Sequence, residues 1–150
     1  MFAAGRRSVR ILIVDDDPGF RELLAFVVRV DTGAELVGQA CDGDEAVRLA
    51  EELEPDLVLM DLLMPKLDGF EATRRIAARV QHAEILVISS TTEPGDVARA
   101  LEAGAAGFLP KDRAVTKLPE LIGQLRPPRT KMPWAWQMPL LRLSELAQNA

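Results

Sequence analysis

Two short runs of large apolar residues, at positions 11–14 (ILIV) and Leu57–Met60 (LVLM), restrict the fold of this chain more than any other feature. A strand that is apolar at every position has both faces covered, which is typical of a parallel sheet with helices on each side. Other short apolar runs follow along the chain, separated by helical patterns. Five strands are therefore expected, at 9–14, Glu35–Ala40, Leu57–Met60, 85–89 and 107–109.

Between and after these strands, apolar residues recur at the 3.6-residue spacing of a helix. The first such stripe consists of Phe20, Leu23, Leu24, Val27 and Val28. Similar stripes follow the other strands, and Gly104 is placed to end the fourth helix. Strands that alternate with helices predict an α/β fold with a five-stranded parallel sheet and helices on both faces.

The last helical stripe, which ends at Leu125, contains Pro119. Proline lacks the backbone N–H that a helix interior uses, so it is tolerated in the first turn. The last helix is therefore expected to begin close to Pro119.

The 150 residues, 48% hydrophobic and 27% charged, fit one globular domain with a short extension. Cys41 is the only cysteine and has no partner for an internal disulfide, which favours a reducing compartment. The first apolar run has four residues and ends in carboxylates, unlike a secretory signal or a membrane span. We expect a cytoplasmic protein that does not associate with membranes.

Charge is unevenly distributed along the chain. Residues 126–150 carry four basic residues and one acidic residue, so the net charge of −5 divides into +3 there and −8 in residues 1–125. An acidic body argues against direct nucleic-acid binding. The basic segment is too small to read DNA by itself.

Polar side chains follow the predicted strands at the points where those strands end. Asp15 and Asp16 follow the first strand, Asp61 the third, Ser89 ends the fourth and Lys111 follows the fifth. In an open parallel sheet, sites form at the carboxyl ends of the strands. We therefore expect these five side chains to meet at one edge.

This set of groups suits divalent-metal binding and phosphoryl transfer. Mg²⁺ prefers hard oxygen ligands and takes one or two carboxylates together with phosphate oxygens. A carboxylate can itself be the nucleophile, and a lysine and a hydroxyl can share the charge of the transferring group. Asp61 is isolated and central, so it is the better nucleophile, whereas the clustered acids are the better metal ligands.

Four motifs occur in order, namely ILIVDDDP, PDLVLMDLLMPKLDG, ILVISS and EAGAAGFLPKD. Together they make the chain resemble the receiver domain of two-component response regulators. The likeness is greatest to the branch whose members often carry a helix-turn-helix output domain. The resemblance implies a flavodoxin-like fold with strand order 2-1-3-4-5. It divides the chain into an N-terminal arm (1–8), a receiver domain (9–126) and a Pro- and Trp-containing extension (127–150).

The resemblance also assigns roles around the metal. Asp61 would accept a phosphoryl group from a sensor histidine kinase or a phosphotransfer protein. Asp16 would bind Mg²⁺, or Mn²⁺, directly, and Asp15 would bind it largely through water. Leu63 would offer only its backbone carbonyl. Because Leu63 stands where asparagine is common in the family, altered dephosphorylation is expected.

Further roles concern the switch that phosphorylation operates. Lys111 would pair with the phosphoryl oxygens, Ser89 would hydrogen-bond one of them, and Phe108 would swing inward as the hydroxyl moves. The face formed by the last two strands and helices would change and could support a homodimer. Output, expected to be transcriptional, would act through a partner or an effector domain. Pro110 precedes the lysine where many receivers have a proline after it, so no cis bond is assumed.

Two other interpretations stay open. The spacing Asp15-x-Asp17, with a later serine and lysine, also resembles a haloacid-dehalogenase-type phosphatase, in which Asp15 is the nucleophile and Asp17 the acid/base. That interpretation leaves Asp61 unexplained. Alternatively, the chain is a pseudo-receiver, a binding module that is never phosphorylated. Asp17 is in either receiver interpretation expected to be a helix N-cap.

The extension contains Trp134 and Trp136, the only tryptophans of the chain, followed by a leucine-rich stretch that predicts one short amphipathic helix. It is either a linker or a segment that docks on the receiver or on a second copy. Its 24 residues are too few for a helix-turn-helix domain.

Overall fold

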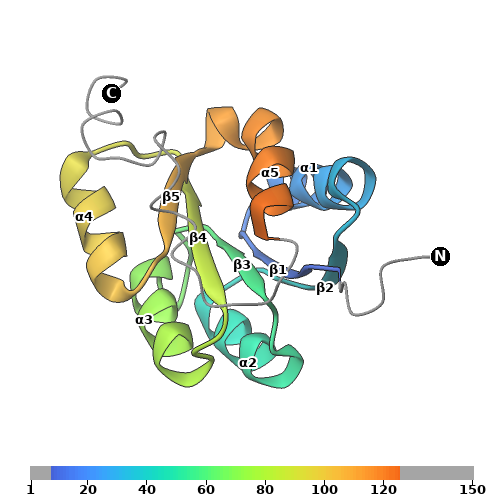
Figure 1. Ribbon diagram of the computed structural model, residues 1–150. Coiled ribbons are helices and arrows are strands. Elements are labelled where there is room, and N and C mark those ends of the chain that lie inside the picture. The colour runs from blue at the N-terminus through green and yellow to red at the C-terminus, as the bar shows by residue number, and fades with distance from the viewer. Residues whose placement is uncertain (1–7, 126–150) are drawn as a thin grey trace.

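The computed structural model describes residues 8–125, so the predicted extension at 127–150, its short helix and almost all of the N-terminal arm lie outside the described residues. The described chain forms a five-stranded, all-parallel sheet in the order β2-β1-β3-β4-β5, with helices on both faces (Figure 1). This confirms the predicted fold class and strand order.

Each strand agrees with its predicted position to within one residue at either end. The strands are β1 (Arg10–Val14), β2 (Glu35–Ala40), β3 (Leu57–Met60), β4 (Glu84–Ser89) and β5 (Gly107–Pro110). All residues of β3, a central strand, are buried, as expected for a strand covered on both faces, and the edge strand β5 is buried throughout as well.

Five α-helices and one short π-helix connect and flank the strands. They are α1 (Pro18–Val27), η1 (Val28–Thr32), α2 (Gly43–Leu53), α3 (Gly69–Arg79), α4 (Pro94–Ala103) and α5 (Lys111–Leu125). Asp17, Asp42 and Asp68 cap the N-termini of α1, α2 and α3, and each carboxylate accepts a hydrogen bond from a backbone N–H of the first turn. Gly104 ends α4 at a φ of 118°, a left-handed conformation that favours glycine.

The predicted start of the last helix is wrong. The helix α5 begins at Lys111 and holds Pro119 in its interior. Proline there leaves the carbonyl of Val115 without its helical donor. Val115 is exposed, so water can satisfy that carbonyl, and the buried residues Leu118 and Leu121 hold the helix against the sheet.

The predicted apolar stripe of α1 also needs correction. Leu24 and Val27 are buried as expected, but Leu23 is exposed. The helix continues into the π-turn η1, where Thr32 Oγ1 donates to the Val28 carbonyl at 2.6 Å. Val28, in this turn, is buried as predicted, whereas Leu23 lies in the regular part of the helix.

The core consists of two layers, one on each face of the sheet. One layer joins β1, β3 and β4 residues to α2, α3 and α4, and Phe108 lies within it. The other joins the opposite side of the same strands to α1, η1 and α5 (Figure 1). Within residues 8–125, none of the helices combines the length and apolar character that a membrane crossing requires.

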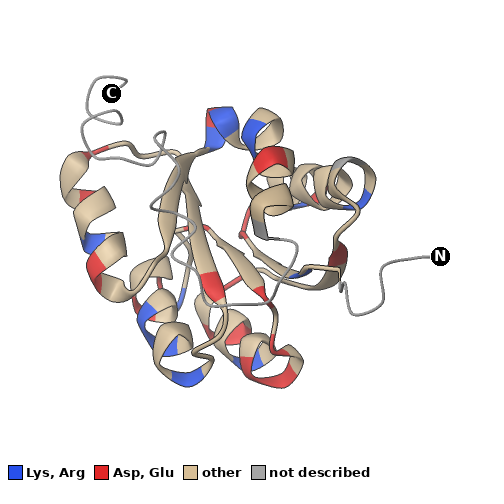
Figure 2. Ribbon diagram, viewed as in Figure 1, with Lys and Arg blue, Asp and Glu red and all other residues tan. Residues whose placement is uncertain are grey.

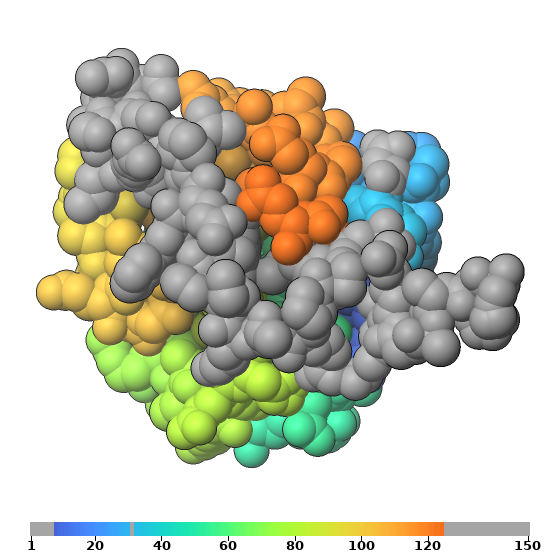
Figure 3. Space-filling model, viewed as in Figure 1, coloured from blue at the N-terminus to red at the C-terminus, as the bar shows by residue number. Residues whose placement is uncertain are grey.

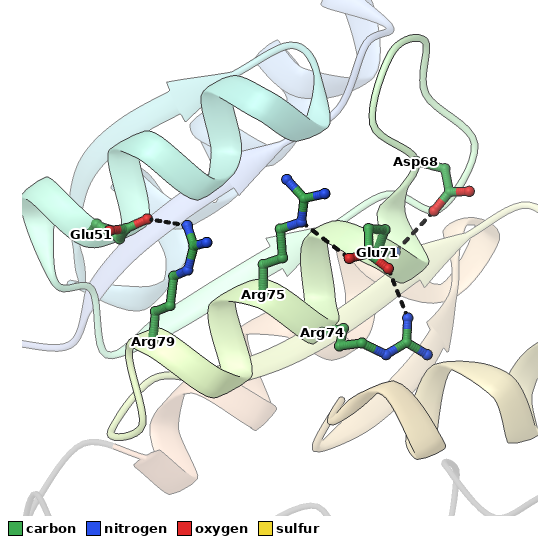
Figure 4. A network of polar contacts seen from close by, with 6 residues as sticks. All are labelled: Glu51, Asp68, Glu71, Arg74, Arg75 and Arg79. Carbon is green, nitrogen blue, oxygen red and sulfur yellow. Dashed lines mark hydrogen bonds and ion pairs between the residues drawn. The ribbon is translucent and has the colours of Figure 1, made fainter.

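An ion pair connects α2 and α3 on the surface, where acidic and basic residues are interspersed (Figure 2). Arg79 Nη1 lies 2.9 Å from Glu51 Oε2 and bridges the two helices (Figure 4). Arg74 and Arg75 both bind the carboxylate of Glu71, which lowers the pKa of Glu71. These groups are exposed, and such pairs contribute little to stability individually.

Thr73, on the buried face of α3, provides a first prediction. Its side chain is fully buried and its hydroxyl has no hydrogen-bond partner among the described residues. A buried hydroxyl without a partner is destabilising, so Thr73→Val should raise the free energy of unfolding by about 1 kcal/mol. Urea unfolding followed by circular dichroism measures this. Thr116→Val is the control, because that exposed hydroxyl lies on the solvent side of α5, and its effect should stay within about 0.5 kcal/mol. Loss of stability in Thr73→Val would contradict the prediction.

Candidate functional site

The carboxyl ends of β1, β3 and β5 bring Asp15, Asp61 and Lys111 to the same edge of the sheet. The Asp15 backbone N–H donates to the Ala40 carbonyl and the Asp61 N–H donates to the Val14 carbonyl, both at 3.0 Å. These bonds extend the parallel pairing one residue past the strands. They fix the backbone from which both carboxylates project.

Three carboxylates form an acidic cluster at this edge. One oxygen each of Asp15, Asp16 and Asp61 lie within 4.8 Å of one another. Asp15 is 1% exposed and Asp61 4% exposed, whereas Asp16 is open to solvent. Sequence reasoning predicted this convergence, and the described structure brings the three together.

The pKa of Asp61 is raised from 3.8 to about 7. Burial is the main cause, because it disfavours the charged form, and the negative charges of Asp15 and Asp16 act in the same direction. The Lys111 ammonium and a hydrogen bond from the Leu63 backbone N–H oppose the shift without cancelling it.

Lys111, the first residue of α5, supplies the cation beside this cluster. Its Nζ lies 3.1 Å from Asp15 Oδ2 and 3.8 Å from Asp61 Oδ1. The same ammonium lies 4.6 Å from the centroid of the Phe20 ring, within range of a cation–π interaction. Lysine therefore sits between the metal-side acid and the central acid, as predicted, although it is closer to Asp15.

The charges of the site fit a divalent cation. Three carboxylates and one ammonium leave two uncompensated negative charges when all are ionised. The donors are hard oxygen atoms, some buried and one open to water, which is the ligand type that Mg²⁺ prefers while keeping several waters. Asp15, Asp16 and Asp61 are the side chains that could hold such an ion.

Two contacts around Asp15 were not predicted from the sequence. Arg21 Nη1 donates to the Asp15 carbonyl at 2.7 Å, and Phe20 lies under the Lys111 ammonium. Both residues belong to the first turn of α1, directly after the aspartates. That position was the available signal, but the helical spacing of Phe20 predicts only a place in the core stripe.

Asp17 does not join the cluster. It is exposed, and its Oδ1 accepts a hydrogen bond from the Gly19 N–H at 3.0 Å, which confirms it as the N-cap of α1. Its own N–H donates to Asp15 Oδ1 at 2.8 Å. Asp17 thus orients Asp15 through its backbone and directs its carboxylate toward the helix, away from the role that the phosphatase interpretation requires.

Ser89 and Phe108, the two residues predicted to switch, are both fully buried. Ser89 ends β4, the strand next to β3, and its hydroxyl accepts a hydrogen bond from the Thr91 N–H at 3.3 Å. Phe108 pairs in register with Val87, two residues before Ser89 on the same strand. The aromatic ring therefore occupies the core in this structure.

Leu63 follows Asp61 by two residues and is 62% exposed. With Asp16, Met64 and Arg99 it lines a shallow cavity of about 430 Å³ beside the acidic cluster.

Comparison with known proteins identifies the class. The response regulator receiver domain family matches residues 11–123. A parallel sheet in this order, with an acidic cluster and a lysine at its carboxyl edge, belongs to that class. The chain is a member of the response regulator receiver domain family.

Its relatives include both transcriptional regulators and methylesterases. LiaR of Bacillus subtilis, a transcriptional regulatory protein, is 38% identical over 76% of this chain and 54% of its own length. A protein-glutamate methylesterase/protein-glutamine glutaminase of Photobacterium profundum is 39% identical over 79% of this chain and 32% of its own. The chain thus spans about a third to a half of the curated relatives it matches.

Solved receiver structures agree over a similar region. The signal receiver domain of the response regulator NarL from Mycobacterium tuberculosis superposes with a TM-score of 0.74 at 34% identity, covering 77% of this chain and 94% of that one. The response regulator domain of Thermotoga maritima CheB gives a TM-score of 0.72 at 34% identity, covering 79% and 96%.

Proposed function

We propose that this chain is a phosphorylation-controlled switch that accepts a phosphoryl group on Asp61 from a sensor histidine kinase or a phosphotransfer protein. The observation that supports this most is the burial of Asp61 between two other carboxylates and beside Lys111 at the carboxyl edge of the sheet. Strongly shifted pKa values are common at functional sites, and the raised pKa of Asp61 is therefore in line with a functional role.

In the proposed step, an Asp61 carboxylate oxygen attacks the phosphorus of a phosphohistidine. A P–O bond forms, the P–N bond breaks, and the imidazole nitrogen leaves with the electron pair and takes a proton from solvent. Bound Mg²⁺, or Mn²⁺, would lower the charge repulsion between the incoming phosphoryl group and the carboxylates.

The protein's own residues would hold this arrangement. Asp16 would bind the metal directly, Asp15 largely through water, and Leu63 through its backbone carbonyl. Lys111 would turn from Asp15 and Asp61 toward the phosphoryl oxygens, where an ammonium stabilises the developing charge. The chain would thus assist its own phosphorylation and dephosphorylation without being a turnover enzyme.

Phosphorylation would then shift an equilibrium between two arrangements of the face formed by β4, α4, β5 and α5. Ser89 would bond a phosphoryl oxygen, and the position of Phe108 in the core would be favoured. This face could support a homodimer. The switch would control transcription through a partner or an effector domain. We expect the protein to act in the cytoplasm. Direct nucleic-acid binding by residues 1–125 is not expected from their charge of −8.

Removing one metal ligand provides a second prediction. Asp16→Asn should weaken Mg²⁺ binding by at least about tenfold, because even residues that only orient ligands have effects of that size. The Mg²⁺-dependent rise in Tm measures the affinity. Asp17→Asn is the matched control, since asparagine caps a helix as well as aspartate and the Mg²⁺ affinity should not change. Equal affinities for Asp16→Asn and the parent would contradict the assignment.

Acetyl phosphate with Mg²⁺ distinguishes the three functional interpretations. Borohydride reduction and peptide mass spectrometry then locate the acyl phosphate. An adduct at Asp61 supports the receiver, and hydrolysis that depends on Asp15 with no adduct at Asp61 supports the phosphatase. Absence of any adduct or hydrolysis supports the pseudo-receiver.

A further inference from the structure

The first helix exposes an apolar surface. Leu23, Phe26 and Val30 are 42%, 59% and 61% exposed. They are separated by three and four positions, so they lie along one side of α1 and η1. We call these three residues the α1 patch. Exposed Glu22 and Arg29 are next to it in sequence, and an apolar patch with a polar rim is typical of a binding surface.

The helix α5 lies beside η1, the element that carries Val30 of the patch. Both helices begin at the carboxyl edge of the sheet, where Lys111 meets the Phe20 ring. The helix α1 has 10 residues and η1 has 5, whereas α5 has 15, and α5 contacts both along one face of the sheet. At 1.5 Å per residue, both run about 22 Å away from that edge. The last residues of α5 therefore end next to η1, as the adjoining blue and orange surfaces show (Figure 3).

The sequence that follows α5 has the composition to cover such a patch. Residues 126–150 contain both tryptophans of the chain, Trp134 and Trp136, and four leucines between 140 and 146. Their net charge of +3 complements the −8 of residues 1–125. The nine residues 126–134 can span up to about 30 Å when extended, which exceeds the length of about 10 Å between positions 23 and 30.

We propose that the segment 126–150 docks on the α1 patch of its own chain through Trp134 and Trp136. Tryptophan anchors provide large contact areas in small interfaces. A tethered segment has an effective concentration in the millimolar range, so it competes well against a second copy at lower concentrations. The contact would cover Phe26 and Val30 and would join the end of α5 to α1. This inference does not depend on phosphorylation of Asp61.

Tryptophan fluorescence of the full chain tests the proposal, because every tryptophan lies in the docking segment. We expect the parent to emit at shorter wavelength than the free peptide 126–150. Phe26→Ser with Val30→Ser should move the emission to that of the peptide and raise quenching by acrylamide several-fold. Leu101→Ser is the matched control, since Leu101 is an exposed leucine, 37% exposed, on α4 across the sheet. It should leave the emission unchanged.

Three results would overturn the proposal. The parent could already emit like the peptide, the two serines could leave the emission in place, or the blue shift could grow with protein concentration, which would indicate docking on a second copy. Circular dichroism checks that the double variant is folded. Leu23→Ser alone, a smaller change in the same patch, should give a partial shift in the same direction.

Discussion

Asp61→Asn should stabilise the metal-free protein by up to about 4 kcal/mol above pH 7. The carboxyl pKa is raised from 3.8 to about 7, and a shift of that size corresponds to this free energy. The sign follows from proton binding. Between these two pH values the folded state holds a proton that the unfolded state has released, so stability falls as pH rises through this range and stays low above it. Asparagine carries no charge to bury and removes the decline.

Urea unfolding in EDTA from pH 4 to pH 8 measures this effect. The parent should lose stability across the range, while Asp61→Asn should lose much less and the two curves should converge near pH 4. Asp17→Asn, which changes an exposed cap, should follow the parent. Added Mg²⁺ should recover stability in the parent only. If the curves for the parent and Asp61→Asn were parallel, Asp61 would not be the carboxyl group of the cluster whose pKa is raised.

Gly69→Ala should destabilise the protein by about 3 kcal/mol and slow phosphorylation of Asp61. A Cβ at position 69 would lie 2.2 Å from the Asp61 carbonyl oxygen and 2.5 Å from the Leu62 Cα. Both atoms are backbone, so relief requires the peptide after Asp61 to move, and overpacking of this kind has costs at the upper end of the usual range. The Gly69 N–H also donates to the Leu62 carbonyl at 2.9 Å, which holds the two segments together.

Gly95→Ala is the matched control for this prediction. Both glycines lie in the first turn of a helix, but a Cβ at position 95 meets nothing within 4 Å. Thermal unfolding should show a large loss for the first variant and almost no change for the second. Equal stabilities would show that the close approach of α3 to the Asp61 backbone is relaxed at little cost.

The five strands could be predicted because their information is local. Runs such as Leu57–Met60 are apolar at every position, and this pattern is typical of a strand whose two faces are both covered. The order of the strands came from the family resemblance, since periodicity does not determine which strands are neighbours. Asp17 was predicted as an N-cap from its place before a helical stripe, and Asp42 and Asp68 cap α2 and α3 from the same local position.

The helices deviated where tertiary packing overrides local preference. Pro119 is tolerated inside α5 because the neighbouring turn is exposed on one side and buried on the other. The stripe of α1 predicted Leu23 in the core, but the side of α1 that packs against the sheet is the one that holds Leu24 and Val27, and Leu23 is exposed. Sequence patterns identify an apolar face without identifying what covers it.

The sequence was sufficient to predict which side chains meet at the site. It was not sufficient to predict the distances between them. Aspartates and a lysine at strand ends must share an edge once the sheet is parallel. That Lys111 lies nearer to Asp15 than to Asp61, and above Phe20, depends on how two loops and a helix start are packed. The roles of Ser89, Phe108 and the Leu63 carbonyl remain proposals.

Phosphoramidate, a small donor with the P–N bond of phosphohistidine, allows the most direct test of the central claim. Intact-mass spectrometry after incubation with Mg²⁺ should show one added phosphoryl group on the parent chain and on Asp17→Asn, and none in EDTA. Asp61→Asn should stay unmodified under the same conditions. Undiminished labelling of Asp61→Asn, with the phosphoryl group on another residue, would contradict the assignment of Asp61 as the acceptor.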